Sequence, residues 1–144
     1  MKKLLVLVLG VMFLLPSLSL AGQKFPSFIS QSAVPLSNQV TPYVNDNKPW
    51  TAQAESYRYR AAGTSQSRSR VTADKSQIRD IDYIYVRCRG YIDTYLSFSD
   101  TDSDTNAADA YANGASGGSF LTVVYGTHEY KEAGYQDIFW ETSY

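Results

Sequence analysis

The sequence predicts an all-β protein: a single antiparallel β-sandwich, or a small barrel, of about seven strands. First, the stretch 76–98 holds two runs of alternating apolar residues on either side of Gly90, which is typical of paired strands with one buried face. Second, turn signals recur roughly every 8 to 15 residues in the last two thirds of the chain. Third, aromatic residues make up 14% of the chain and include 12 tyrosines, which suits a thin core with amphipathic rings at its rim.

The first 21 residues have the pattern of a bacterial secretory signal peptide. Lys2 and Lys3 precede an apolar run over 4–15, and the small residues Ser19 and Ala21 suit cleavage after Ala21. This run is shorter than the roughly 20 residues that a membrane-spanning helix needs, and no second apolar run follows it. The sequence therefore predicts a secreted or periplasmic protein with no transmembrane segment after signal cleavage.

Residues 22–49 predict an irregular leader, because Ser, Asn and Gln fill this segment without a sustained period. Four prolines interrupt it: Pro26, Pro35, Pro42 and Pro49. The β-sandwich domain is then predicted to occupy residues 50–144, a length that suits one domain.

Two runs of alternating residues predict the first two strands of this domain. In 50–62 tyrosines face one side and arginines the other, and in 67–73 arginines alternate with small polar residues. The second pattern favours a solvent-facing or edge strand. The alternating residues are Tyr57, Tyr59, Arg58, Arg60, Arg68 and Arg70.

The central pair of strands follows a turn at Asp74 and Lys75. Period two places Ile84, Val86 and Cys88 on one face of the first strand. The same period places Ile92, Leu96 and Phe98 on one face of the second strand. Because Cys88 is the only cysteine, no disulfide can form within the chain, and its place on the apolar face predicts a small buried residue.

The remainder of the chain predicts an acidic connection and three further strands. Residues 99–109 are polar and acidic, and the alanine-rich stretch 107–112 is too short for a stable helix, so it is interpreted as a strand. Residues 114–119, GASGGS, predict a hairpin loop. Residues 120–130 and 136–144 are rich in Val, Ile, Tyr, Phe and Trp, which favours strands.

Charge is unevenly distributed, although the net charge is only -1. Cations dominate residues 55–89, whereas Lys131 is the only cation in 90–144, against nine carboxylates. Such asymmetry indicates either a basic ligand surface or complementarity between early Arg-bearing and late carboxylate-bearing strands. We favour internal complementarity.

Asp100, Asp102 and Asp104 form the most specific local motif. Alternating oxygen ligands in a loop suit calcium, which takes six to eight hard oxygen ligands. A helix-loop-helix calcium site would also need Gly and Glu where this chain has Thr105 and Tyr111. The motif therefore predicts either a looser calcium loop or a solvated acidic turn, and calcium is the only cofactor that the sequence indicates.

The sequence contains two candidate catalytic features, and both lack the partner residues that catalysis needs. Gly114, Ser116 and Gly118 match the nucleophile motif G-x-S-x-G, but no helix follows and no acid lies between Ser116 and His128. His128 is the only histidine, and period two predicts a hydrogen-bonded residue near a strand end. The sequence therefore predicts a protein that is not an enzyme, with a small hydrolase based on His128 and a nearby carboxylate as the weakest alternative.

The six alternating arginines and tyrosines of 57–70 form the predicted ligand-binding face. Arginine beside exposed aromatic rings binds anionic glycans or lipids, and tyrosine and tryptophan rings stack on flat apolar surfaces. Nucleic acid is not expected for an exported chain of near-neutral charge. We expect a secreted, non-enzymatic binding protein that contacts an envelope glycan, an anionic lipid or a surface protein. The alternative is a secreted bacteriocin-like toxin or effector.

Overall fold

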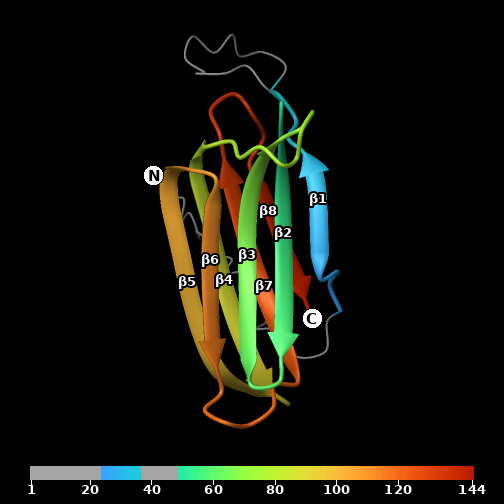
Figure 1. The fold of residues 1–144 in the computed structure, drawn as a ribbon, viewed down its shortest axis with the longest axis vertical. Helices are drawn as coiled ribbons and strands as arrows, with labels where there is room; N and C mark the ends of the chain where they lie inside the picture. The colour runs from blue at the N-terminus through green and yellow to red at the C-terminus, as the bar shows by residue number, and fades with distance from the viewer. Residues whose placement is uncertain (1–23, 37–48) are drawn as a thin grey trace, which may run out of the picture.

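The computed structural model describes residues 24–36 and 49–144, which form eight strands and no helix. The strands make two antiparallel four-stranded sheets, and this confirms the predicted all-β sandwich (Figure 1). The first sheet has the order β1-β2-β3-β6, and the second has the order β5-β4-β7-β8. The strands are β1 (Phe28–Ser32), β2 (Trp50–Tyr59), β3 (Ala62–Val71), β4 (Ile81–Ile92), β5 (Tyr95–Ala107), β6 (Asp109–Ala115), β7 (Val123–Lys131) and β8 (Ile138–Ser143).

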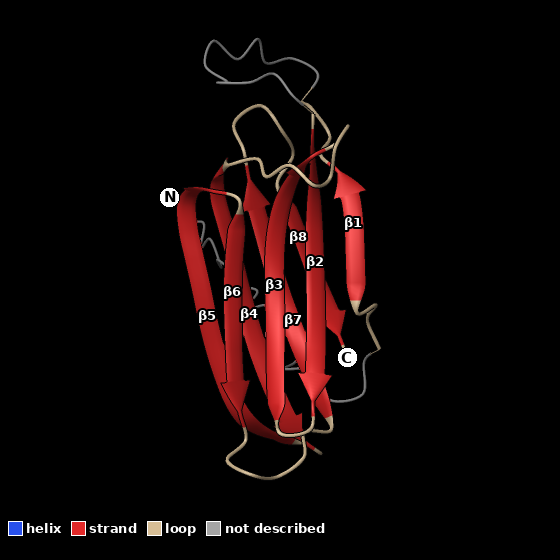
Figure 2. Cartoon of the chain, viewed as in Figure 1, coloured by secondary structure: helices blue, strands red, loops and turns tan. Residues whose placement is uncertain are grey.

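The strands run along the long axis of the molecule, so the loops gather at its two ends (Figure 2). The β2–β3, β4–β5 and β6–β7 connections lie at the end drawn at the bottom of the figure, and the β3–β4 and β7–β8 connections lie at the other end. No helix long and apolar enough to cross a membrane occurs in the described residues. The predicted signal peptide, residues 1–21, lies outside them.

The inner faces of the two sheets differ in the size of their side chains. The first sheet turns mostly alanine and serine inward, because these residues alternate with larger outward residues along β2, β3 and β6. The second sheet supplies the bulk through Ile84, Val86, Val124 and Tyr130, all fully buried. Trp50 closes one end of the core and contacts Tyr130 at 6.3 Å between ring centroids.

Three details of the predicted strand pattern are wrong. Five residues of the predicted irregular leader form β1, which pairs with β2. Of the two alternatives for the Arg-bearing strand β3, the edge strand is wrong, because β3 lies between β2 and β6, whereas its arginines do lie on the outer face of the sheet. The predicted central pair is β4 and β5, but only β4 is central, since β5 forms the edge of its sheet.

Gly90 does not separate the two strands of that pair. β4 continues through Gly90 to Ile92, and the chain turns at Asp93, which has a positive φ of 53°. A shift in strand register follows Gly90. The physical role of Gly90 is to leave space, since a β-carbon there would lie less than 3.0 Å from the ring of Phe98.

Phe98 fills a space that three glycines leave between the sheets. Gly63 on β3, Gly90 on β4 and Gly114 on β6 would each place a β-carbon less than 3.0 Å from the Phe98 ring. Phe98 comes from the edge strand β5 and packs, half-buried, against the core. The ring therefore joins both sheets near the end of the sandwich where the β2–β3 turn lies.

Ion pairs confirm the internal complementarity that the charge distribution favours. Arginines from the basic part of the chain meet carboxylates from the acidic part, and one of these pairs is almost completely buried. The pairs are Arg70–Asp109 at 2.7 Å, Arg79–Glu132 at 2.9 Å and Arg89–Glu141 at 3.4 Å. Much of the predicted charge asymmetry is thus neutralised within the protein.

Candidate functional site

The six residues of the predicted ligand-binding face do not form one continuous surface. Arg68 and Arg70 point outward from the half of β3 that pairs with the start of β2. The other four surround the β2–β3 turn, where Thr64 is the register partner of Tyr57. Four residues of extended chain, about 13 Å, separate Thr64 from Arg68. The residues near the turn are Tyr57, Arg58, Tyr59 and Arg60.

Arg68 and Arg70 are engaged within the first sheet. Arg70 forms two hydrogen bonds to the carboxylate of Asp109, at 2.7 Å and 3.3 Å. Arg68 lies 3.6 Å from the carboxylate of Glu55 and also bonds to a neighbouring glutamine. These cross-strand pairs lower the positive charge available to an external ligand, so this half of the predicted face is structural.

Arg58 and Arg60 have a different environment. Arg58 donates to the backbone carbonyls of Leu121 and Thr122, which precede β7. Arg60 lies over the ring of Tyr59, 5.5 Å from its centroid. Within the described residues neither arginine is ion-paired with a carboxylate. No carboxylate of residues 24–36 or 49–144 therefore neutralises their positive charge.

Exposed apolar side chains gather around these two arginines. They come from four separate parts of the chain: the end of β2, the start of β5, the β6–β7 loop and the residue after β8. Tyr95 is 79% exposed and Phe120 is 71% exposed, the two highest values among the exposed large apolar side chains of the described residues. We call this surface the aromatic end; it consists of Tyr57, Tyr59, Tyr95, Leu96, Phe120 and Tyr144.

Hydrogen bonds tie the loops of the aromatic end together. The carbonyl of Arg60 accepts the amide of Leu121 at 2.9 Å, which joins the β2–β3 turn to the β6–β7 loop. The hydroxyl of Thr122 accepts the amide of Asp93 at 2.8 Å, which joins that loop to the β4–β5 turn. The rings of Tyr57 and Tyr144 lie 5.3 Å apart. The exposed rings therefore project from connected turns rather than from independent loops.

The sequence alone did not identify most of the aromatic end. The alternation with arginine indicates Tyr57 and Tyr59, but the predicted apolar face for Leu96 is wrong, since this side chain is 51% exposed, and Phe120 lies in a loop rather than in the predicted strand. A usable signal was present, because Tyr95 and Phe120 each follow a turn of polar or glycine residues directly. Only the sandwich topology shows that these turns meet at one end.

His128 is the centre of a polar network inside the core. Its Nδ1 lies 2.9 Å from the hydroxyl of Ser67, and its Nε2 lies 2.8 Å from the hydroxyl of Thr142. Ser56 extends the network, 2.5 Å from the Thr142 hydroxyl and 2.8 Å from that of Ser65. His128 is hydrogen-bonded as predicted, but it lies inside β7 rather than near a strand end.

Because the His128 side chain and its hydroxyl partners are buried, this hydrogen-bond network stabilises the core. The His128 side chain is fully buried, and desolvation lowers its pKa from 6.5 to about 3, so the imidazole is neutral. Gly126 provides the space, because a β-carbon there would lie 2.5 Å from His128 Nε2 and 2.6 Å from the Thr142 hydroxyl. Both ring nitrogens are bonded to hydroxyls, and Ser116 of the G-x-S-x-G motif bonds to the carbonyl of Ser119 in its own loop. The imidazole is therefore closed off from solvent and separate from Ser116.

The lone cysteine is also part of the core. Cys88 is fully buried on β4, and desolvation raises the pKa of its thiol to about 11. A thiol that stays protonated is a weak nucleophile and a poor metal ligand. The predicted assignment of Cys88 as a small buried residue is confirmed.

The three aspartates of the predicted calcium motif lie in strand β5, so the predicted acidic connection is wrong. Their register partners are inward-facing residues of β4, and their side chains therefore point towards the open edge of the first sheet. There Asp102 accepts the amide of Tyr111 at 2.8 Å, and Asp100 accepts the amide of Asn113 at 3.0 Å. Asp104 accepts the amide of the next residue in its own strand.

These carboxylates take hydrogen bonds that the edge strand β6 would otherwise leave unmade. Unpaired amides on an edge strand attract other strands, and inward-pointing charges are one way to prevent this. Among the described residues, no group of three or more His, Cys, Asp or Glu side chains is arranged to hold a metal ion. Successive side chains on one face of a strand are also about 7 Å apart, which does not favour convergence on one cation.

Replacing Asp102 by alanine is expected to lower the free energy of unfolding by about 1 kcal/mol, because the Tyr111 amide loses its acceptor. The melting temperature of the unmodified protein is expected to be the same with calcium and with a chelator. Thermal unfolding followed by circular dichroism measures both quantities. A calcium-dependent rise that Asp102→Ala abolishes would instead support the calcium site predicted from the sequence.

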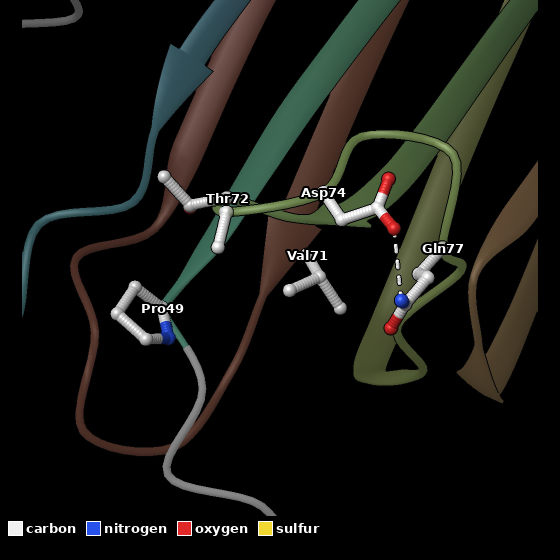
Figure 3. Close-up of a pocket in the computed structure, with 6 residues that line it drawn as sticks. Pro49, Val71, Thr72, Asp74 and Gln77 are labelled. Carbon is white, nitrogen blue, oxygen red and sulfur yellow. Dashed lines mark hydrogen bonds between the residues drawn. The ribbon is translucent and has the colours of Figure 1, made fainter.

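A hollow of about 440 Å³ lies at the end opposite the aromatic end (Figure 3). The Asp74 carboxylate at its rim accepts hydrogen bonds from Ser76 and Gln77, and the Ser76 bonds hold the Asp74 pKa below its usual value. This carboxylate thus stabilises its own loop. The hollow also borders Pro49, which directly follows undescribed residues 37–48, so we do not assign a site there. Its lining consists of Pro49, Val71, Thr72, Ala73, Asp74 and Gln77.

Comparison of this chain with protein-family models, curated proteins and solved structures finds no match. The functional interpretation therefore depends on the surface itself. Within the described residues, the aromatic end combines exposed rings, arginines without a carboxylate partner and connected turns. It is the candidate functional site.

Proposed function

We propose that this chain is a secreted, non-enzymatic binding protein that attaches to a cell envelope or another extracellular surface through its aromatic end. The observation that carries the proposal is the clustering of exposed rings from distant parts of the chain on connected turns. Exposed apolar clusters of this kind mark interaction sites in soluble proteins. Secretion is supported by the signal pattern of residues 1–21.

The burial of the reactive groups supports a binding role rather than catalysis. His128 and Cys88 are sealed in the core, and both are uncharged near neutral pH. The polar groups at the aromatic end, such as Arg58 and Thr122, bond to the backbone of neighbouring turns. A rigid scaffold that presents loop residues is a common arrangement for recognition.

We expect the processed protein to sediment with isolated cell envelopes, and Phe120→Ser to weaken this binding about tenfold. Burying one phenylalanine side chain contributes about 1.5–3 kcal/mol, and about 1.4 kcal/mol corresponds to a tenfold change in affinity. Phe139→Ser is the matched control, because Phe139 is 64% exposed but lies on β8, away from the aromatic end. Sedimentation over a range of envelope concentrations measures the difference.

Equal loss in both variants would show that general surface hydrophobicity, and not the aromatic end, drives the attachment. No sedimentation of the unmodified protein would remove the proposal. Growth inhibition or dye leakage from susceptible cells would support the alternative of a secreted bacteriocin-like toxin.

A further inference from the structure

We propose that the aromatic end docks on a lipid bilayer that has anionic headgroups. This inference rests on the proposed function and specifies the surface to which the protein attaches. It depends on three properties of the described residues: the chemistry of the exposed side chains, the placement of charge, and the internal use of polar groups.

The exposed side chains match the layers of a membrane interface. The side chains of Leu96 and Phe120 have no polar atom and project from two neighbouring turns. Leu96 is 51% exposed and Phe120 is 71% exposed. Such side chains gain free energy by entering the acyl-chain boundary of a bilayer. Tyr59 and Tyr95 have an apolar ring with a hydroxyl at its tip, and tyrosine is enriched at the headgroup level of membranes.

Charge is placed so that this end faces an anionic surface. Lys24, Arg58 and Arg60 lie at or near the aromatic end. The nearby carboxylates of the described residues are Asp93, which accepts a hydrogen bond from the Thr122 hydroxyl, and Glu55, which lies 3.6 Å from Arg68. Each basic residue near an anionic bilayer contributes about 1 kcal/mol.

Carboxylates predominate at the opposite end of the sandwich. There Lys75, Arg79 and Lys131 are outnumbered by Asp74, Asp80, Asp82, Glu132 and Asp137. A molecule polarised in this way is oriented by an anionic surface before contact.

Several polar groups in the turns of the aromatic end are bonded within the protein, so the surface that this end presents consists mainly of tyrosine rings, Leu96 and Phe120. Such a surface favours a bilayer interface, where tyrosine and apolar side chains are enriched, over a glycan, which is bound by several precisely placed polar groups beside the stacking rings. Here the guanidinium of Arg58 bonds to Leu121 and Thr122, and Asp93 bonds to Thr122 through its amide and carboxylate. The hollow beside Asp74 and a smaller one of about 180 Å³ beside Gln136 and Phe139 both lie away from this end.

Sedimentation with vesicles tests the inference directly. The processed protein is expected to bind vesicles of phosphatidylcholine mixed with phosphatidylglycerol, and to bind phosphatidylcholine alone at least tenfold more weakly. Binding to the mixed vesicles is expected to weaken with added salt. Arg60→Glu and Phe120→Ser are each expected to reduce it about tenfold, whereas Phe139→Ser is expected to bind like the unmodified protein.

Fluorescence of Phe120→Trp adds a readout that does not depend on loss of binding. Its emission is expected to shift to shorter wavelength on mixed vesicles, because the indole leaves water. The unmodified protein is the reference, since its own tryptophans, the fully buried Trp50 and the half-buried Trp140 of β8, lie away from the aromatic end and are expected to show no shift. Circular dichroism and a melting curve establish that each variant is folded.

Two results would overturn the lipid inference. If the protein binds whole envelopes and delipidated envelope polysaccharide but not mixed vesicles, the surface is a glycan and the proposed function still holds. If Phe120→Trp shows no shift while the protein sediments with vesicles, the aromatic end is not the contact. Failure to bind envelopes, polysaccharide and vesicles removes both proposals.

Discussion

Replacing Phe98 by alanine is expected to lower the free energy of unfolding by about 3 kcal/mol. The ring fills a space between the sheets that Gly63, Gly90 and Gly114 leave open, and removal of a packed phenylalanine leaves a cavity that the surrounding strands fill only in part. Chemical denaturation of the two proteins, followed by circular dichroism, measures the difference.

A double-mutant cycle tests whether Gly90 is required because a larger residue would overlap the Phe98 ring. Gly90→Ala alone is expected to destabilise by about 1–3 kcal/mol, because the new methyl group overlaps the Phe98 ring. In the Phe98→Ala background most of this cost is expected to disappear, since the methyl group then occupies vacated space.

Gly126→Ala is the matched control for this cycle. It introduces the same methyl group into a strand, but its close contacts are Ser56, His128 and Thr142 and do not include Phe98. Its cost is therefore expected to be the same in both backgrounds, as for independent sites. A cost for Gly90→Ala that is equally unchanged by Phe98→Ala would contradict the role assigned to the glycines.

The part of the fold that follows from local pattern was predictable from the sequence. Apolar alternation over 84–88 is visible residue by residue, because one face of this strand is buried in a continuous core. The β-branched and aromatic composition of 120–130 likewise predicts a strand, and β7 begins within it at Val123. The inward assignment of Cys88 came from the same alternation. The complementarity of early arginines and late carboxylates was also predictable as a tendency, although the partners themselves were not.

The edge of the sandwich was not predictable by the same reasoning. Asp100, Asp102 and Asp104 occupy inward positions of β5, where alternation favours apolar residues, so the pattern indicated a loop. Asp100 and Asp102 accept hydrogen bonds from amides of β6, and β6 belongs to the other sheet. Strand pairing across sheet edges is a property of topology, and composition does not encode it.

The aromatic end was not predictable from the sequence for a related reason. Tyr59, Leu96 and Phe120 lie far apart in the sequence and in different structural contexts, and only Tyr59 belongs to a pattern that indicates a binding surface. They meet because successive strands of an antiparallel sandwich reverse direction, so alternate turns fall at the same end. The predicted arginine and tyrosine face includes the β2–β3 part of this surface. It also includes Arg68 and Arg70, but both of these arginines are ion-paired with carboxylates of the first sheet.

Lowering the pH is expected to destabilise the protein through His128. The pKa of His128 is about 3 in the folded protein and 6.5 in the unfolded chain, so below pH 6.5 the unfolded chain binds the proton first. The full contribution of the neutral imidazole is present above pH 6.5 and is lost as the pH falls towards 3. The expected loss is up to about 1.4 kcal/mol per pH unit in this window.

The His128→Gln variant isolates this effect. Glutamine keeps a donor and an acceptor for the hydroxyls of Ser67 and Thr142 but does not titrate. Every other titrating group is the same in the two proteins, so its contribution cancels in their difference. The difference between the two unfolding free energies, measured by urea denaturation from pH 8 to about pH 4, is therefore expected to be constant above pH 7 and to shrink below pH 6.5. Parallel curves over the whole range would show that the imidazole takes up a proton in the folded core as readily as in the unfolded chain, and that the hydroxyl network is not the closed, neutral structure described here.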